Sequence, residues 1–442
     1  MTDGGASGSS PFDSLRASGS SPSDSLRASG SSPGPVTRHS VATVGAATAI
    51  TALCGYAVLY LAARALEPAG FSVFSVFWGA FGLVTGAANG LLQEATREVR
   101  AVSLNPDVGP GHRTHPMRVA ALVGVVAAAV IAGTSPLWAP HVFVESPVLS
   151  VALLSAGLAG FCMHATLLGM LAGVNRWSQY GALMVTDAAI RVAVAAGTVV
   201  LGWQLVGFLW ATVAGAVAWL ILLIASPATR LAARLVTAGS PGTFLRGAAH
   251  SIAAAGASAI LVMGFPVLLK ATSADLGAAG GVVILAVTLT RAPLLVPLTA
   301  MQGNLIAHFV DQRDARLRAL LAPAAVVAGL GAIGVLAAGL LGPWLLVVAF
   351  GPEYRAEGAL LAWLTAAAVA IAMLTLTGAA AVAAALHRAY AAGWIIATVA
   401  AVALLLLPVG LQTRTVIALL CAPLVGIAVH LGALRRASVP PA

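Results

Sequence analysis

Stretches of about twenty apolar residues follow one another along almost the whole chain, and they leave few choices of fold. A helix needs about 20 such residues to cross the hydrocarbon layer of a membrane. Backbone polar groups in hydrocarbon must be satisfied within the segment, so each stretch is expected to be a helix. The candidate spans are residues 41–63, 71–93, 119–139, 148–171, 180–201, 204–225, 250–269, 280–306, 319–341, 359–385, 389–408 and 415–434. The sequence therefore predicts an all-α, polytopic membrane protein with about 12 transmembrane helices.

Composition excludes the main soluble classes. Charged residues make up 8% of the chain, against about 25% in soluble domains. That leaves too little polar surface to cover a globule in water. The three cysteines, Cys54, Cys162 and Cys421, lie inside apolar runs without the spacing of metal ligands, so neither a metal site nor a disulfide is expected. No cofactor is expected either.

The basic residues predict an orientation. The net charge of +9 comes from arginines scattered in short loop clusters, which does not indicate nucleic-acid binding. With the amino terminus inside, 17 basic residues fall on the cytoplasmic side, and the outer side holds 4: Arg64, Lys270, Arg355 and Arg414. This excess predicts that both termini are cytoplasmic. The abundance of Ala, and of Arg over Lys, is typical of a high-GC bacterial genome, so a multi-pass protein of a bacterial plasma membrane is expected.

The spans divide into two equal sets around the longest internal connection. Residues 1–40 carry an eleven-residue Ser/Gly/Pro-rich repeat, which predicts a disordered cytoplasmic tail. The expected domains after it are a first six-helix bundle (41–225), a cytoplasmic connecting segment (226–249), a second six-helix bundle (250–434) and a short cytoplasmic tail (435–442). Two six-span halves suggest a duplicated transporter plan.

Few ionisable residues lie within the spans, and such residues are functional candidates. Asp187 and Arg191 are four apart on one helix and can pair. Their pair either locks spans together or serves a cavity. Arg291 has no acid within one helical turn, so its charge needs water, a carbonyl or an anionic ligand. Pro293 and Pro297 follow it and are expected to bend the helix.

Aromatic residues mark a second candidate site. Tyr56, Tyr60 and Arg64 lie on one face of the first span at i, i+4 and i+8. They can stack on sugar and hold an anion, or they can anchor the span at the membrane edge. His164 on the fourth span is read as a packing residue rather than a proton relay.

Enzyme chemistry has little support in the sequence. The first outer loop offers Glu67 alone as a carboxylate, and no Walker sequence, GxSxG or loop Ser/His/Asp arrangement occurs. The chain is therefore not expected to be an enzyme.

Several short motifs resemble those of Wzx-type polysaccharide flippases, which belong to the multidrug/oligosaccharidyl-lipid/polysaccharide exporter superfamily. The matching segments are Arg64-Ala-Leu-Glu-Pro-Ala-Gly-Phe71, Leu171-Ala-Gly-Val-Asn-Arg-Trp177, Phe244-Leu-Arg-Gly247, Arg291-Ala-Pro293 and Phe350-Gly-Pro-Glu-Tyr-Arg355. Their order and spacing cover nearly the whole chain after residue 40. The chain departs from the family at Glu67 and Ser72, where glycines are usual, and in the apolar run MGFPVLL of span seven.

The resemblance implies two six-helix bundles around a central cavity that opens to each leaflet in turn. It implies a flippase that moves a polyprenyl-(pyro)phosphate-linked saccharide from the inner to the outer leaflet of the lipid bilayer, with envelope glycosyltransferases as partners. The resemblance implies a cavity lined mainly by spans one, two, seven and eight, and our candidate substrate-binding residues are Arg291, Arg64, Tyr60, Tyr56, Arg191 and Asp187. The alternatives are a small-molecule exporter of the same superfamily, a twelve-span facilitator, a cell-envelope glycosyltransferase or polymerase, and a scaffold that transports nothing.

Overall fold

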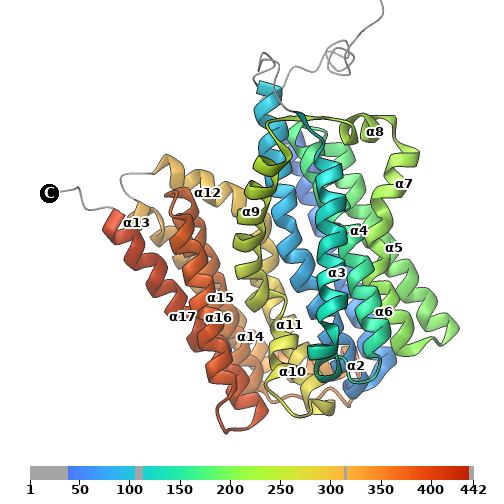
Figure 1. Ribbon diagram of the computed structural model, residues 1–442. Helices are drawn as coiled ribbons and strands as arrows, with labels where there is room; N and C mark the ends of the chain where they lie inside the picture. Colours follow the sequence, from blue (N-terminus) through green and yellow to red (C-terminus); the bar gives the residue numbers. More distant parts are fainter. Residues whose placement is uncertain (1–37, 105–112, 313–315, 438–442) are drawn as a thin grey trace, which may run out of the picture.

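The computed structural model describes residues 38–104, 113–312 and 316–437, and these are almost entirely helical (Figure 1). The predicted amino-terminal tail lies outside the described residues as far as position 37. The last five residues of the predicted carboxyl-terminal tail lie outside them as well.

The first half of the chain forms one set of helices. They are α2 (Arg38–Leu104), α3 (Pro116–Val142), α4 (Pro147–Gly173), α5 (Trp177–Leu201) and α6 (Gln204–Ala214), which continues through the 3₁₀ turn η2 (Gly215–Val217) into α7 (Ala218–Ala225). The short helix α8 (Pro227–Ala233) then leads toward the second half, which lies beside the first in Figure 1.

The second half begins with α9. Its helices are α9 (Pro241–Val262), α10 (Phe265–Ala271), α11 (Gly277–Ala300), α12 (Gln302–Asp311), α13 (Arg316–Ala319), α14 (Leu321–Phe350), α15 (Gly358–Ala383), α16 (His387–Leu405) and α17 (Leu411–Ala437). Helix α9 starts inside the predicted connecting segment 226–249, because the Ser240 hydroxyl accepts a hydrogen bond from the Thr243 amide (3.2 Å) and caps a polar first turn.

Within the described ranges, eleven helices are long and apolar enough to cross a membrane. The first of them, α2, is two helices joined at Glu67, whose φ of 55° and ψ of 171° are not helical. Pro68 follows and cannot donate a backbone hydrogen bond. The chain reverses there: Ala47 packs at Gly181 near the start of α5, and Val99 packs at Gly173 at the end of α4. The all-α, polytopic prediction is confirmed, and α2 supplies two of twelve passes.

The most buried helices are α4 and α15, the fourth and tenth passes. Both are apolar around their whole circumference, as a helix enclosed by other helices must be. By contrast, α14 is apolar but almost unburied, so its side chains face outward, where a membrane would surround them.

The same turn follows both central helices. After α4, the amides of Asn175 and Arg176 donate to the carbonyls of Ala172 and Leu171. After α15, the amides of Ala385 and Leu386 donate to those of Val382 and Ala381 in the same pattern. Asn175 and Ala385 each have a φ of 59°. These are Schellman turns, and their equivalent positions support a duplicated six-span unit.

A two-stranded antiparallel sheet joins the two halves. Strand β1 (Arg113–Thr114) pairs with β2 (Thr237–Ala238), and the Thr114 hydroxyl donates to the Gly239 carbonyl at 2.9 Å. The loop after the second pass is therefore tied to the segment that leads into α9.

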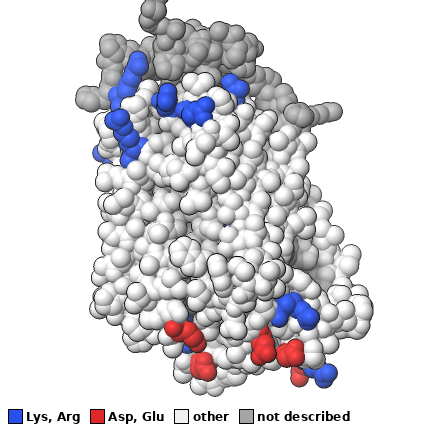
Figure 2. Space-filling model, turned by 90° about the vertical axis from the view of Figure 1, so that its right-hand side faces the viewer, with Lys and Arg blue, Asp and Glu red and all other residues white. Residues whose placement is uncertain are grey.

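Charge divides between the two ends of the bundle. We call the end that holds Arg38 and Ala437 the terminal side, and the opposite end the distal side. On the face that Figure 2 shows, basic side chains cluster toward the terminal side, and the distal side carries acidic side chains together with a few basic ones. The terminal-side arginines with described side chains are Arg97, Arg100, Arg113, Arg118, Arg176, Arg230, Arg234, Arg246, Arg318, Arg388, Arg435 and Arg436.

The second pass packs against α9 through a row of glycines. A β-carbon at Gly86 would lie 2.7 Å from that of Ala259, and one at Gly90 would lie 2.2 Å from the Ile252 amide nitrogen. The turn between the first two passes contacts α11, where Pro68 touches Gly281 on the distal side. In the first pass, no atom of the described residues lies within 4 Å of a β-carbon placed at Gly45 or Gly55, nearer the terminal side. The first pass is therefore less enclosed toward that side than the second.

Candidate functional site

Two arginines lie deep in the described spans. Arg191 is fourteen residues from the start of α5 on the terminal side, and Arg291 is fourteen residues from the start of α11 on the distal side. At about 1.5 Å per residue, each lies about 21 Å from its end of the bundle. Both are therefore far from bulk water, where a guanidinium needs local partners.

Arg191 is neutralised within its own helix. Its Nε donates to Asp187 Oδ2 and its Nη2 to Asp187 Oδ1, both at 3.0 Å. Its Nη1 donates to the Thr212 carbonyl, just before the 3₁₀ turn η2, and its guanidinium carbon lies 5.2 Å from the centre of the Phe81 ring. Gly215 makes room for the pair, since a β-carbon there would lie 2.2 Å from Asp187 Oδ1. The geometry fits the locking alternative better than a free cavity site.

Arg291 forms no ion pair with any acid that the structure describes. Its side chain is more than nine-tenths buried, with the guanidinium carbon 5.2 Å from the centre of the Phe265 ring. Nη1 donates to the Val262 carbonyl at 3.3 Å. That carbonyl lacks its usual helical donor because Pro266, four residues later, has no N–H. Nη2 has no partner among the described residues. The buried guanidinium is thus left with one N–H group that has no hydrogen-bond partner in the described part of the chain.

Tyr56 and Tyr60 line a pocket of about 340 Å³ between the first pass and α11, which we call the tyrosine pocket. Its other lining residues are Leu59, Leu285, Thr288, Leu289, Ala292 and Phe350. Beside this pocket the Leu289 carbonyl lacks its usual helical donor, because Pro293 has no N–H. Arg291 does not line this pocket but is the chain neighbour of Ala292, which does.

On the distal side the two halves meet through aromatic rings, a set we call the distal contact. It comprises Tyr60 and Phe71 of α2 with Phe350 and Tyr354 of the second half. The buried Tyr354 hydroxyl donates to the Ala63 carbonyl at 2.9 Å. This hydrogen bond joins residues 291 positions apart in the sequence.

Arg64 lies beside the distal contact and is exposed. A β-carbon at Gly351, whose φ is 113°, would lie 3.3 Å from Arg64 Nη1 and 2.6 Å from Glu353 Oε2. Only glycine therefore leaves space for these two side chains beside the backbone of residue 351.

The six predicted site residues thus occupy separate places. Asp187 and Arg191 pair inside the first half, and Tyr56 and Tyr60 share the tyrosine pocket. Arg64 lies at the distal edge, and Arg291 faces the break between α9 and α10. The sequence analysis did not identify Tyr354 or the Val262 carbonyl. Pro266 in the segment MGFPVLL could have indicated the carbonyl, because a proline four residues later leaves it without a helical donor.

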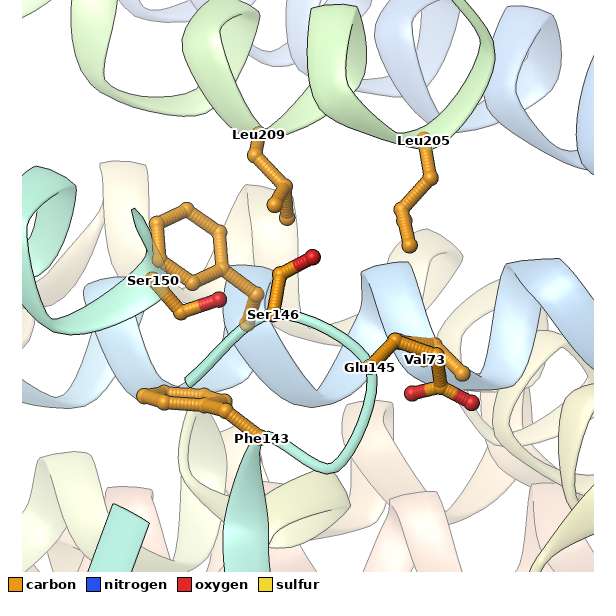
Figure 3. A pocket seen from close by; sticks show the side chains of 8 residues that line it. Val73, Phe143, Glu145, Ser146, Ser150, Leu205 and Leu209 are labelled. Carbon is orange, nitrogen blue, oxygen red and sulfur yellow. The ribbon is translucent and has the colours of Figure 1, made fainter. Parts of the chain in front are cut away.

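A second, smaller pocket lies on the distal side of the first half (Figure 3). The loop that carries Glu145 and Ser146 faces Leu205 and Leu209 of α6, with Phe143 nearby. Its volume of about 10 Å³ is at most that of one water. We therefore assign it no ligand.

His164 is fully buried in α4 and stacks on Phe161, with ring centroids 5.3 Å apart. In the second half, His430 contacts the Thr377 hydroxyl (3.1 Å) and the Tyr390 carbonyl (3.2 Å). Among residues 38–104, 113–312 and 316–437, no three His, Cys, Asp or Glu side chains group as metal ligands would.

The overall architecture is found in solved transporters. An inward-facing conformation of a multidrug resistance MATE family transporter of the MOP superfamily has a TM-score of 0.68 at 17% identity, over 89% of this chain and 96% of that one. An outward-facing conformation of such a transporter has a TM-score of 0.62 at 15% identity, over 91% and 97%. A MOP superfamily transporter from Pyrococcus furiosus, described by the reverse polarity of its binding pocket, has a TM-score of 0.63 at 14% identity, over 90% and 96%. The chain has the MATE transporter fold.

Relatives in sequence are mycobacterial. No family model matches the chain. The uncharacterized protein Rv3630 of Mycobacterium tuberculosis (strain ATCC 25618 / H37Rv) is 74% identical over 396 residues, which are 90% of this chain and 92% of that protein. The uncharacterized protein Rv1510 of the same strain is 71% identical over 396 residues, 90% and 91% of the two chains. The chain therefore belongs to the family that contains Rv3630 and Rv1510 of Mycobacterium tuberculosis.

Proposed function

We propose that this protein is a flippase that moves a lipid-linked oligosaccharide, a polyprenyl-(pyro)phosphate-linked saccharide, from the inner to the outer leaflet of the plasma membrane by alternating access. The observation that carries the proposal is the buried, acid-free Arg291 with its open Nη2. A phosphate that crosses a membrane must exchange water for other donors, and a guanidinium supplies them in a geometry that fits phosphate oxygens.

The tyrosine pocket supports a saccharide or lipid ligand. Its two tyrosine rings and Phe350 offer flat apolar faces, while Thr288 and the Leu289 carbonyl are polar. No acid lines it. An anionic ligand would meet no repelling carboxylate there.

The difference in packing between the two sides of the bundle supports alternating access. The distal contact and the Pro68–Gly281 contact join the halves on the distal side, whereas the first pass is less enclosed toward the terminal side. The higher TM-score with the inward-facing MATE conformation agrees with this asymmetry. We take the terminal side as cytoplasmic because arginines are concentrated there, so cytoplasmic envelope glycosyltransferases would deliver the substrate.

Flipping by the purified protein in liposomes tests the proposal. The substrate is a short-chain polyprenyl pyrophosphate carrying a fluorescent saccharide, and a membrane-impermeant quencher reports which leaflet holds it. Arg291→Ala should lower the rate at least about tenfold, because a charge-assisted contact is lost. Arg291→Lys should keep part of the rate, since it retains the charge but not the planar fork.

The matched control is Arg388→Ala, which removes an exposed arginine on the terminal side. It should flip at the wild-type rate. Wild-type protein that is correctly inserted and does not flip the lipid contradicts the proposal.

The second candidate is a small-molecule exporter, which the mostly apolar lining of the tyrosine pocket favours. Efflux of apolar dyes from the same liposomes separates the two. An exporter moves dye and is indifferent to Arg291→Ala, whereas the flippase depends on that arginine.

A further inference from the structure

Two arginines within the spans have similar surroundings, and only one of them forms an ion pair with an acid. Arg191 and Arg291 each donate Nη1 to a carbonyl at a helix break, Thr212 before η2 and Val262 before α10. Each guanidinium carbon lies 5.2 Å from the centre of a phenylalanine ring. The environments therefore match in a hydrogen bond and in an aromatic contact.

The difference lies one helical turn earlier. Four residues before Arg191 stands Asp187, whose carboxylate binds Nε and Nη2 at 3.0 Å. Four residues before Arg291 stands Val287, which is 4% exposed. Residues four apart share one face of a helix, so an acid at position 287 would be within reach of Arg291. With valine there, Nη2 has no partner among the described residues.

We infer that Val287 is a specificity-determining residue: it withholds an internal counter-ion from Arg291 and so reserves Nη2 for the phosphoryl group of a ligand. This inference rests on the proposed function and specifies its substrate class as an amphiphile with a phosphate headgroup. A buried unpaired charge is costly, and a site that binds a mobile anion must leave its cation free when empty. An arginine that served only to cap the Val262 carbonyl would gain from an adjacent acid, as Arg191 does.

Val287→Asp tests the inference directly. The probe is dodecyl phosphate, and its binding to the full chain in micelles of dodecyl maltoside, a detergent without phosphate, is measured by calorimetry. The aspartate should form the pair that Asp187 forms with Arg191 and weaken binding at least about tenfold, since it replaces the ligand in a charge-assisted contact. The variant should remain monodisperse and melt no earlier than wild type, because the buried charge is now paired.

Two further variants separate charge from shape. Val287→Asn has the size of the aspartate without its charge, and its effect on binding should be much smaller. Thr299→Asp adds an acid to the same helix two turns beyond Arg291 and should bind dodecyl phosphate as wild type does. Equal binding by Val287→Asp and wild type overturns the inference, and so does an equal loss with asparagine.

A comparison with inorganic phosphate shows whether the site prefers a phosphate on an alkyl chain or free phosphate. Wild type should bind dodecyl phosphate more tightly than inorganic phosphate, because the alkyl chain also gains an apolar contact. Equal affinities overturn the amphiphile class.

The liposome assay keeps the two proposals apart. Wild type that binds dodecyl phosphate in a Val287-dependent way but does not flip the saccharide lipid refutes the flippase and leaves the role of Val287 standing. Flipping by wild type together with unchanged binding by Val287→Asp refutes the role of Val287 alone.

Discussion

At the scale of single residues, glycine makes room for charged side chains. The Asp187–Arg191 pair lies against the backbone of Gly215, and Arg64 and Glu353 each lie against Gly351. In both places a β-carbon would occupy the space that a charged side chain uses. Each glycine therefore acts together with the charged side chains beside it, and Gly215 does so with residues that are distant in the sequence.

Gly215→Ala should consequently destabilise the fold. A β-carbon there would lie 2.2 Å from Asp187 Oδ1 and 2.6 Å from Arg191 Nε. We expect the free energy of unfolding to fall by about 1–3 kcal/mol, as for an overpacked core. Thermal unfolding in detergent measures it.

Gly197→Ala is the matched control, because no atom in the described part of the chain lies within 4 Å of a β-carbon at that position of α5. It should be neutral or raise stability by about 0.5–1 kcal/mol, as alanine does in a helix interior. Equal losses in the two variants would contradict the role of the ion pair.

At the scale of elements, the connection from α14 to α15 does more than join two helices. It carries Tyr354 into the first half of the protein, where its ring contacts Phe71 and its hydroxyl bonds to Ala63. This contact joins the two halves on the distal side. It must therefore break if the halves open toward that side. The short loop is thus a part of the closure between the halves.

Tyr354→Phe should weaken that closure. Loss of one buried hydrogen bond should lower the free energy of unfolding by about 1 kcal/mol at neutral pH. Burial raises the pKa of the Tyr354 hydroxyl above its usual value of about 10. The unfolded chain then loses this proton at a lower pH than the folded chain, so the contribution is present below about pH 10 and lost as the pH rises further.

Denaturant unfolding of wild type and Tyr354→Phe between neutral pH and pH 11 checks both parts. The difference between the two should shrink above about pH 10. Tyr60→Phe, at an exposed tyrosine of the same contact, is the control. A difference that stays constant with pH would contradict burial of the Tyr354 hydroxyl.

At the scale of the whole molecule, both charge and the contacts between the halves differ from one side to the other. The terminal side carries most of the arginines, and the distal side carries the Tyr354–Ala63 hydrogen bond. Basic residues are retained on the cytoplasmic side during insertion. The charge pattern therefore predicts that the structure is closed toward the outer face.

Reporter fusions test this orientation. Alkaline phosphatase, which is active only outside the cytoplasm, should be inactive when fused after Ala437 and active when inserted between α10 and α11. The reverse result would invert the direction of every proposed step.

Much of the fold was predictable from hydropathy and charge because these are properties of short segments. Apolar length predicted the twelve passes, and Asp187 with Arg191 predicted their own pair because both lie on one helix. The duplicated turns after α4 and α15 were not predictable, since Asn175 and Ala385 share a backbone conformation and not a residue type.

The sequence did not predict how each helix is rotated about its own axis, or which helix packs beside it in the bundle. Helices that are apolar all round, such as α4 and α15, carry no signal for which face meets which. The open group of Arg291, the tyrosine pocket and the Tyr354–Ala63 bond all depend on such pairings between distant segments. Hydrophobic burial has no direction, so packing among the assembled helices decided where these groups lie.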